Sequence, residues 1–184
     1  NYFSQAILGV ENPRVGLLNI GEEEDKGNQV SLTTHKFMKQ LPINFCGNVE
    51  GRDITRGKAD VVVCDGFVGN NMLKFGEGIS KLFSEFFKEE SKTSLISLIS
   101  LFLLKPAFKR FKKKFDYDSY GGANLLGIKG VSIIAHGSAK KVAIKNAIKV
   151  AMRAHKNDVV SKIAKAIEET KNLNNELITE EESA

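Results

Sequence analysis

The sequence predicts an α/β protein built on a mostly parallel β-sheet. Two runs of β-branched and aliphatic residues, at 14–20 and 60–64, have the continuous apolar character of strands that are buried on both faces. Strand-like and helix-like segments alternate between residues 14 and 90, an order typical of parallel strands that are joined by helices. Polar, glycine-rich segments follow three of the predicted strands, so the sheet carries candidate ligand-binding loops.

The elements up to residue 90 follow from apolar spacing and from the positions of glycine and proline. In chain order we predict the end of a helix at 1–10, a strand at 14–20, a polar loop at 21–28, a helix at 30–41, a short strand at 43–46, a short helix or turn at 53–58, a strand at 60–64 and a long helix at 68–90. The helix at 30–41 is predicted because Val30, Phe37 and Met38 can share one face. Gly47 and Asn48 are predicted to end the short strand before them.

Residues 91–115 interrupt this alternation. Leu95–Leu104 is apolar but shorter than the ~20 residues that a membrane-spanning helix needs. Beyond Pro106, phenylalanines recur every three to four residues with Lys and Arg between them, which indicates an amphipathic basic helix. We predict a helical hairpin that packs against the body or a second subunit, contacts a membrane surface, or does both. Its candidate contact residues are Leu98, Phe102, Leu103, Phe108, Arg110, Phe111 and Lys112.

The last part of the chain returns to a strand and two helices. We predict a glycine turn at 120–124, a strand at 131–135 and helices at 139–153 and 157–177. Ser138 precedes the first of these helices and is a candidate N-cap, because a serine side chain can accept a hydrogen bond from a free N–H of the first turn.

Composition narrows the classes of function. The net charge is +5, but six of the 27 basic residues lie at 105–114, and the rest of the chain is nearly neutral. The positive net charge therefore does not imply nucleic-acid binding over the whole surface, and the basic segment could contact anionic lipid, an acidic protein or a phosphate backbone. Cys46 and Cys64 lie within apolar runs, so we predict buried, inert thiols rather than a disulfide or a nucleophile. The spacing of His, Cys and acidic residues matches no metal-ligand pattern, and we expect no metal and no cofactor.

Three polar segments are candidates for chemistry. In Gly21–Asn28 the glycines allow close backbone approach, and Lys26 is a compact cation that could hold phosphate. Asp65–Asn71 follows a strand and opens a helix whose free N–H groups could bind an anion. His136–Ser138 repeats this arrangement, and His136 could donate to a developing oxyanion. The alternative interpretations are a solvated loop, a tight turn and a structural histidine.

These three segments share one edge of the sheet only if their strands run in the same direction. Such a pocket would hold anion-binding turns, one Lys and one His, with no evident nucleophile. This set favours transfer to or from phosphate over covalent hydrolysis. The other histidines, His35 and His155, fall in helical runs and are predicted to face solvent.

Several strings, in order along the chain, carry a resemblance to one family. They are Asn12–Gly21, Lys26–Asn28, Asn44–Asp53, Ala59–Asn70, Tyr120–Ala123 and Ala135–Ser138. From about Asn12 to Ile148 the chain resembles the bacterial phosphate acyltransferase of phospholipid synthesis, the PlsX family. The resemblance implies transfer of a fatty acyl group from acyl carrier protein to inorganic phosphate, giving acyl phosphate. It also implies a three-layer α/β/α sandwich like those of phosphotransacetylases and isopropylmalate dehydrogenases, with a protruding amphipathic helical hairpin.

On this interpretation Lys26, Asn70 and His136 are the candidate catalytic residues. The candidate substrate- and phosphate-binding residues are Gly21, Asn28, Asp65, Gly66, Gly69, Gly137 and Ser138. A strong protein base is not obligatory, because phosphate near neutral pH is already partly dianionic. The site must instead supply a phosphate cradle, donors for the tetrahedral oxyanion and orientation.

The resemblance also implies partners: acyl carrier protein, inorganic phosphate, an anionic membrane surface and a membrane glycerol-phosphate acyltransferase downstream, with no nucleic acid. It implies a cytoplasmic homodimer that associates peripherally with the inner face of the plasma membrane. Because family members are longer, residues 1–184 are expected to be the C-terminal portion of one α/β domain, with 91–115 as an inserted hairpin. The competing interpretations are a phosphate acetyl- or butyryltransferase that acts on acyl-CoA, a noncatalytic membrane-associated interaction module, and a dehydrogenase on the same fold.

Overall fold

The computed structural model describes residues 1–115 and 121–182, with side chains for all of these except 112–115 and 172–182. The chain forms two compact units. The first contains Asn1–Cys64, Ala123–Ile134 and the residues from Ile148 onward. The second contains Asp65–Gly122 and Ala135–Ala147.

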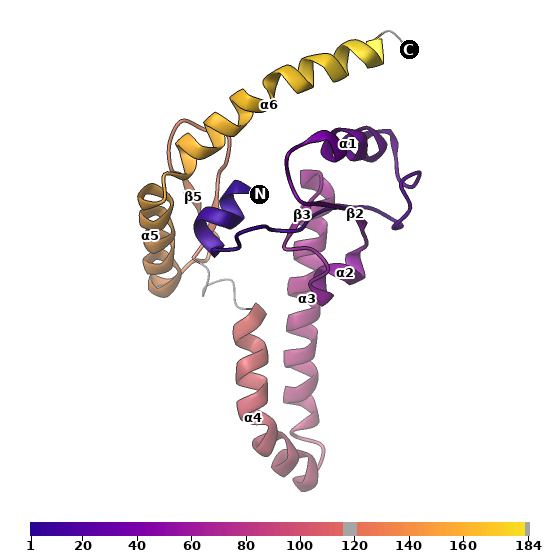
Figure 1. The fold of residues 1–184 in the computed structure, drawn as a ribbon. Helices are drawn as coiled ribbons and strands as arrows, with labels where there is room; N and C mark the ends of the chain where they lie inside the picture. The colour runs from indigo at the N-terminus through magenta and orange to yellow at the C-terminus, as the bar shows by residue number, and fades with distance from the viewer. Residues whose placement is uncertain (116–120, 183–184) are drawn as a thin grey trace. The chain divides into compact units, whose positions relative to one another are not determined.

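A parallel three-stranded sheet organises the first unit (Figure 1). Its strands are β1 (Val15–Leu18), β2 (Phe45–Val49) and β3 (Val61–Val63), in the order β2-β1-β3. Helix α1 (Gln29–Gln40) joins β1 to β2, and helix α2 (Gly51–Arg56) joins β2 to β3. The predicted α/β class, the parallel sheet and the strands expected at 14–20 and 60–64 are therefore confirmed.

Helix α1 packs on one face of this sheet. Val15 and Leu17 are two residues apart on β1, so they point to the same face, where they form a buried cluster with Met38 of α1. Phe45 and Val61 extend this cluster over the neighbouring strands, and Ile43, just before β2, also packs against it. The apolar spacing that predicted a helix at 30–41 thus marks the face that covers the sheet.

Strand β2 extends further than predicted, because a bulge carries it past Gly47. Val15 pairs with Phe45 but Leu17 pairs with Asn48, so two steps along β1 match three along β2. Gly47 has a φ of 85°, a conformation that glycine adopts without steric cost. The expectation that Gly47 and Asn48 end the strand is therefore wrong: both residues lie within it.

An ion pair joins the amino ends of β1 and β3. Arg14 Nε and Asp60 Oδ2 are 3.0 Å apart, and the main-chain N–H of Arg14 donates to the same oxygen at 2.9 Å. Arg14 Nη2 also donates to Asp60 Oδ1 at 3.0 Å, so the guanidinium group contacts both oxygens of the carboxylate. The hydrogen bonds from the Arg14 side chain and main chain lower the pKa of Asp60 to about 2.

Helices from the beginning and the end of the chain pack together in the first unit. The π-helix η1 (Ser4–Leu8) places Ile7 against Ala154 and Val159, which belong to helices α5 (Lys141–Lys156) and α6 (Val159–Glu182). Asn157 donates to the carbonyl of Ala6 at the same junction. These elements confirm the predicted helical character of residues 1–10 and the two predicted C-terminal helices.

The strand expected at 131–135 does not join the parallel sheet. In the described residues, β5 (Ile133–Ile134) pairs antiparallel with β4 (Ala123–Asn124) as a separate two-stranded sheet. Gly127, with a φ of 84°, lies in the connection that reverses the chain, and Leu125 N donates to Ser132 O at 2.9 Å across it. The condition under which the three polar segments share one edge of the parallel sheet is therefore not met by the strand predicted at 131–135.

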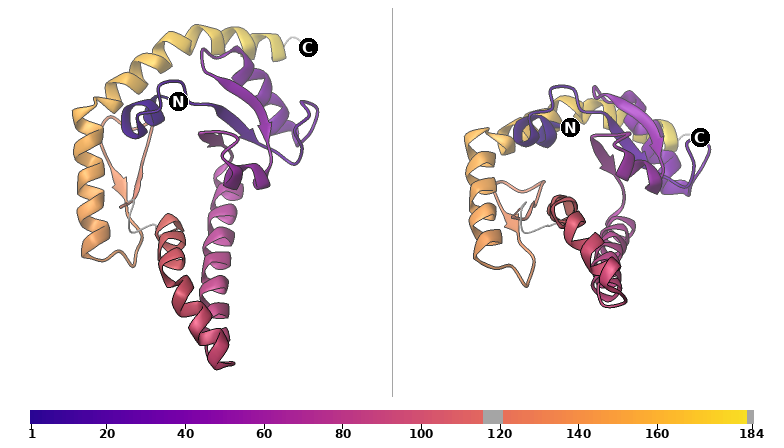
Figure 2. Two further views of the ribbon diagram at one scale, coloured as in Figure 1. Left: turned by 60° about the horizontal axis from the view of Figure 1, so that its bottom comes forward. Right: turned by 90° about the horizontal axis from the view of Figure 1, so that it is seen from below.

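Two long helices form most of the second unit. Helices α3 (Gly66–Glu90) and α4 (Leu95–Phe115) lie side by side in both views of Figure 2. The long helix predicted at 68–90 is confirmed. Residues 91–115 supply the turn and one helix of a hairpin whose other helix is α3, and α4 continues across Pro106. Ser94 starts α4, since its hydroxyl accepts from Ser97 N at 3.0 Å.

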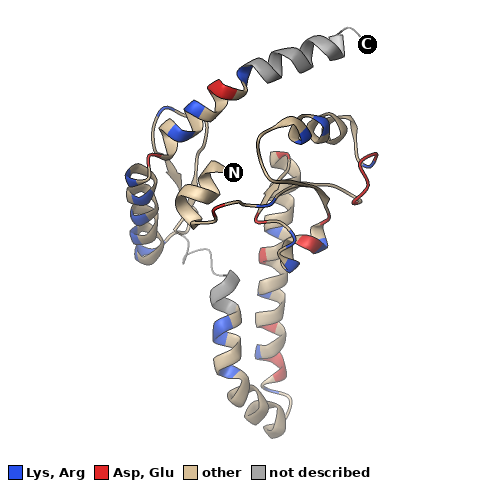
Figure 3. Cartoon of the chain, in the orientation of Figure 1, with Lys and Arg blue, Asp and Glu red and all other residues tan. Residues whose placement is uncertain are grey.

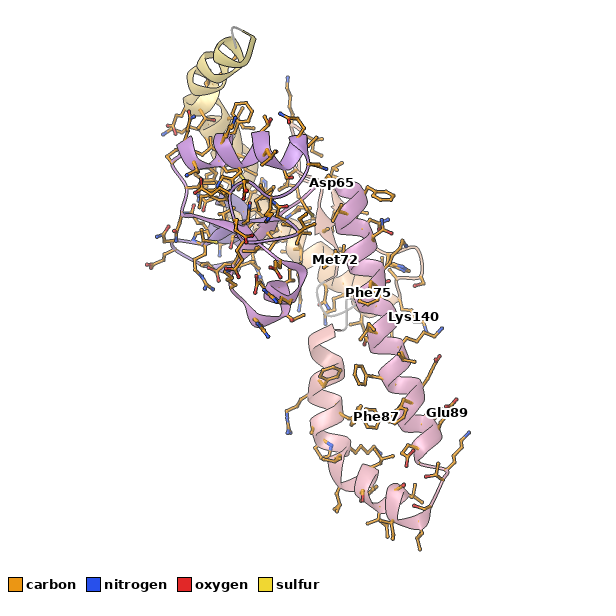
Figure 4. The ribbon with its side chains drawn as sticks, turned by 90° about the vertical axis from the view of Figure 1, so that its right-hand side faces the viewer. Asp65, Met72, Phe75, Phe87, Glu89 and Lys140 are labelled. Carbon is orange, nitrogen blue, oxygen red and sulfur yellow. The ribbon has the colours of Figure 1, made fainter. Side chains whose placement is uncertain are left out.

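Aromatic side chains form the contact between these helices. Phe87 of α3 and Phe108 of α4 meet edge to face with ring centroids 4.1 Å apart, and Phe83 contacts Phe111 at 6.5 Å. Figure 4 shows Phe87 pointing from α3 toward α4. Two of the phenylalanines predicted to contact a membrane or a second subunit therefore pack within the hairpin.

Both cysteines are exposed, so the prediction of buried thiols is wrong. Cys46 lies on β2, an edge strand of the described sheet, and Cys64 lies just beyond the end of β3. The two residues do not form a disulfide with each other.

The packing at Gly16 makes a prediction about stability. A Cβ at position 16 would lie 2.7 and 2.9 Å from the two methyl groups of Val49, which is 1% exposed and has no room to move. We expect Gly16→Ala to lower the free energy of unfolding by about 1–3 kcal/mol, measured by urea denaturation. Gly76→Ala is the control, because a Cβ there meets nothing within 4 Å. In a helix interior this change should be neutral or stabilising by up to about 1 kcal/mol. Equal midpoints for Gly16→Ala and the wild type would contradict the prediction.

The Arg14–Asp60 pair makes a second prediction, on pH. The folded state lowers the pKa of Asp60 from 3.8 to about 2, so the pair stabilises the fold above pH ~4, and this contribution is lost as pH falls toward 2. We expect Asp60→Asn to melt below the wild type near neutral pH, with the gap in Tm closing between pH ~4 and ~2. Asp25→Asn is the control, because Asp25 forms no ion pair among the described residues. A gap that stays constant over this range would contradict the assignment.

Candidate active site

The order of the strands singles out one edge of the sheet. The chain passes from β1 to β2 on one side and then adds β3 on the other side of β1. The carboxyl ends of β1 and β3 are therefore neighbours at a topological switch point, where ligands of parallel α/β sheets bind. The loop Asn19–Asn28 follows β1 at this edge, and Cys64 follows β3.

The loop Asn19–Asn28 is held at several points. Asn19 Nδ2 donates to the carbonyl of Lys26 at 2.8 Å, and Asn48 Nδ2 donates to the carbonyl of Glu23 at 2.7 Å. Two ion pairs add to this: Lys58 with Glu22, and Lys39 with Glu24, each with a closest N–O distance of 2.8 Å. The hydrogen bond from Lys39 lowers the pKa of Glu24. The loop is thus a defined structure and not a freely solvated turn.

Lys26 is exposed on this loop. Among the described residues it forms no ion pair, whereas Lys39 and Lys58, which contact the same loop, are both paired. Gly27 follows with a φ of 104°, and a Cβ there would lie 2.5 Å from Asn19 Oδ1. The ammonium group is therefore a cation without a carboxylate partner on a fixed backbone, which suits it to an anionic ligand.

Two further predicted residues of this loop have structural roles. Asn28 is the N-cap of α1, and its Oδ1 accepts from Ser31 N at 2.9 Å. Its side-chain oxygen is therefore engaged with the helix. Gly21 is buried, and a Cβ there would lie 2.7 Å from Glu23 Oε2.

His35 is buried, so the prediction that it faces solvent is wrong. It is 4% exposed, lies on α1 beneath the loop, and meets the ring of Phe45 edge to face at 5.0 Å. Its Nδ1 lies 2.9 Å from Asn48 Oδ1. His35 and Met38 are three residues apart, so they share the face of α1 that packs on the sheet. This spacing could have predicted from the sequence that His35 is buried. His155, by contrast, is exposed as predicted.

The second segment opens α3 in the second unit. Asp65 is the N-cap, and its Oδ1 accepts from Val68 N at 2.8 Å; Figure 4 shows it at the first turn of α3. Gly66 is the first helical residue, and Gly69 N already donates to Asp65 O at 2.9 Å. Asn70 is exposed on this turn. The first N–H groups of α3 and the Asn70 amide are donors that an anion could use.

The third segment precedes α5 in the second unit. His136 Nδ1 lies 2.7 Å from Ser138 Oγ and accepts from Ser138 N at 3.2 Å. Helix α5 begins at Lys141, so the prediction that Ser138 is its N-cap is wrong. Since the main-chain N–H can only donate, Nδ1 is an acceptor and the neutral ring carries its proton on Nε2. His136, Gly137 and Ser138 are all exposed.

The structure thus brings together the predicted residues within each unit. Lys26, Asn28 and Gly21 share one loop of the first unit, and Asp65, Gly66, Gly69 and Asn70 share one helix start of the second. Sequence reasoning missed Asn19, Asn48 and His35, which support the Lys26 loop. Within the described residues, no group of three or more His, Cys, Asp or Glu side chains could hold a metal ion.

The predicted contact residues of α4 fall into two groups. Phe108 and Phe111 pack against α3, whereas Phe102 and Leu103 are 70% and 72% exposed, and Leu98 is also exposed. Arg110 is exposed, and the side chain of Lys112 lies outside the described residues. Figure 3 shows Lys and Arg, without Asp or Glu, along the described part of α4. Of the helices described, none combines the length and the apolar character needed to cross a membrane.

Comparison with known proteins adds a family and close relatives. Residues 1–162 match the family model FA_synthesis, described as "Fatty acid synthesis protein". The phosphate acyltransferase of Clostridium novyi is 50% identical over 168 residues, which is 91% of this chain and 50% of that protein. Those of Heliobacterium modesticaldum and Moorella thermoacetica are 48% and 50% identical, over 90% and 88% of this chain and 49% and 48% of theirs. The chain therefore spans about half the length of the curated relatives that it matches.

Proposed function

The chain belongs to the FA_synthesis family of fatty acid synthesis proteins, and from this premise we propose that it forms part of an acyltransferase that moves a fatty acyl group from acyl carrier protein to inorganic phosphate. The similarity to three proteins named phosphate acyltransferase, at 48–50% identity, supports this proposal most strongly. The local geometry agrees with it, because Lys26 is an exposed cation on a fixed loop at the ligand-binding edge of the sheet.

The proposed reaction needs no group beyond its two substrates. A phosphate oxygen attacks the thioester carbonyl carbon, and the C–O bond that forms gives a tetrahedral oxyanion. The oxyanion collapses, the C–S bond breaks, and the thiol leaves with the proton that the phosphate monoanion or dianion releases. Acyl phosphate and free carrier thiol are the products. The protein accelerates this step by orienting phosphate and by stabilising the oxyanion.

Three side chains are assigned to these tasks. Lys26 neutralises phosphate charge, and Asn70 and His136 donate to phosphate or to the developing oxyanion. Because Nδ1 of His136 accepts from Ser138 N, the ring N–H of the neutral histidine is Nε2–H. The backbone at Gly66, Gly69 and Gly137 allows close approach of the substrate, whereas Gly21 is buried and leaves room for the Glu23 side chain. Asp65 fixes the start of α3, and Asn28 and Ser138 support the two loops.

The proposal extends to the whole protein. We assign the chain to the C-terminal portion of an α/β domain that forms a three-layer α/β/α sandwich, with the remaining length of the relatives supplying further strands and part of the active site. The enzyme works as a homodimer. Acyl-CoA-dependent acetyl or butyryl transfer and a purely noncatalytic role are the alternatives that the experiment below separates.

The hairpin of α3 and α4 is assigned to membrane contact. Leu98, Phe102 and Leu103 expose apolar surface, and Lys105, Lys109 and Arg110 lie exposed on the same helix. This combination favours the surface of an anionic leaflet, where each cation contributes about 1 kcal/mol. At the inner face of the plasma membrane, the enzyme would deliver acyl phosphate to a glycerol-phosphate acyltransferase.

Activity is tested in a chimera in which this chain replaces the matching 168 residues of the Clostridium novyi protein. With palmitoyl carrier protein and phosphate, we expect phosphate-dependent acyl phosphate, trapped as hydroxamate. Lys26→Ala should lower kcat/KM by ~10²–10³, because one preorganised charge at a reacting group has that effect. The matched control is Lys36→Ala, an exposed lysine on α1.

Near-normal turnover in Lys26→Ala would remove this residue from the mechanism. Activity with butyryl-CoA but not with the carrier-bound acyl group would favour the acyl-CoA alternative. No product from a folded chimera that still binds vesicles would favour the noncatalytic role.

Membrane contact is tested by charge substitutions that leave the α3–α4 packing intact. We expect Phe102→Glu with Leu103→Glu to weaken binding to phosphatidylglycerol vesicles at least about tenfold in sedimentation, because burial of each side chain contributes about 1.5–3 kcal/mol. The control pair, Leu8→Glu with Ile167→Glu, lies in the first unit and starts from similar exposure. Equal binding by both double variants would contradict the assignment.

A further inference from the structure

Two asparagine side chains hold the backbone of the loop that carries Lys26. Asn19 donates to the carbonyl of Lys26 itself, at 2.8 Å, and Asn48 donates to the carbonyl of Glu23, at 2.7 Å. Both bonds end on main-chain oxygens, so they fix the path of the loop directly. The two ion pairs of the same loop join side chains that are largely exposed, and such pairs contribute little.

The orientation of Asn48 follows from the chemistry of its partners. A main-chain carbonyl can only accept, so the end of the amide that faces Glu23 must be the Nδ2 donor. The other end is then Oδ1, which lies 2.9 Å from His35 Nδ1, and that nitrogen must carry a proton. Asn48 is 3% exposed and His35 is 4% exposed. Water therefore competes little for the contact between Asn48 and His35, whereas the bond from Asn48 to the Glu23 carbonyl is partly buried.

Asn19 acts at the other end of the loop. Its Oδ1 accepts from Ile20 N at 2.8 Å while its Nδ2 holds the carbonyl of Lys26. A Cβ on Gly27 would lie 2.5 Å from this Oδ1, so the loop passes over the Asn19 amide with no room for a side chain. The hydrogen bond from Asn19 and the close contact at Gly27 thus hold the Lys26–Gly27 peptide next to the carboxyl end of β1.

We propose that Asn48, oriented by His35, and Asn19 are positioning residues that fix Lys26 for phosphate. The inference rests on the proposed function, in which Lys26 binds the phosphate substrate. Neither asparagine needs to touch the substrate. Their loss releases the loop, so that binding of phosphate by Lys26 must also restore the order of the backbone. The acyl donor is not affected.

The test compares two isosteric changes, one within β2 and one directly before it. Asn48→Asp keeps the acceptor for His35 but turns a carboxylate oxygen toward the Glu23 carbonyl. Asn44→Asp is the control, because Asn44 Nδ2 donates only weakly, at 3.4 Å, to the carbonyl of Asn12 at the other end of β2. Limited digestion with trypsin, followed by mass spectrometry, reports opening at the Lys26–Gly27 bond without any substrate. We expect cleavage there to be about tenfold faster in Asn48→Asp, and unchanged in Asn44→Asp.

Kinetics of the chimera give the second readout. We expect Asn48→Asp to raise KM for phosphate about tenfold and to leave KM for the acyl donor unchanged, a split that general loss of structure would not produce. Asn19→Ala, at a half-buried position, should show the same split and serves if Asn48→Asp fails to fold.

Wild-type rates of cleavage at Lys26, or an unchanged KM for phosphate, would overturn the positioning role while the unsubstituted chimera remains active. An unsubstituted chimera with no transferase activity would instead overturn the proposed function, and the role of Lys26 with it.

Discussion

Backbone hydrogen bonding on both sides of β1 is the interaction on which the first unit depends. This strand pairs in parallel with β2 and with β3, and its side chains Val15 and Leu17 form the buried cluster with α1. Its two ends are tied separately. Arg14 joins the amino end to Asp60, and Asn19 joins the carboxyl end to the loop that follows. The polar loop therefore starts from a strand that is paired on both sides. The hydrogen bond from Asn19 to Lys26 holds the loop against the end of this strand.

Much of this architecture could be predicted, because apolar runs and helical spacing mark which faces are buried. The strands at 14–20 and 60–64 and the helices at 30–41 and 68–90 follow from that pattern. The direction of β5 does not, because a two-residue strand has the same composition whichever way it pairs. The extension of β2 also depends on register: the bulge at Gly47 exists only where β1 lies beside it. The exposure of the cysteines depends on which strand lies at an edge.

Some residues of the candidate site could be predicted from the sequence, and others could not. Residue type and position after a strand were enough to select Lys26, Asp65 and His136. The residues that support the Lys26 loop were not selected, because Asn48 acts on a carbonyl 25 positions away in sequence and His35 lies on a different element. Local capping was also ambiguous. Asn28 and Asp65 cap helices, whereas Ser138 contacts a histidine two residues before it and caps none of the described helices. Such choices are settled by tertiary contacts.

The separation in sequence between Arg14 and Asp60 has a consequence for synthesis of the chain. The two residues are 46 positions apart, and β1 lies between strands that are both made after it. At ~5–20 residues per second, a ribosome needs several seconds to add the partners of β1. During that interval, β1 lacks the two strands that flank it in the folded unit. The sheet therefore closes only once β3 has been added, whereas the hydrogen bonds within α1 are local and can form before β2 and β3 are present.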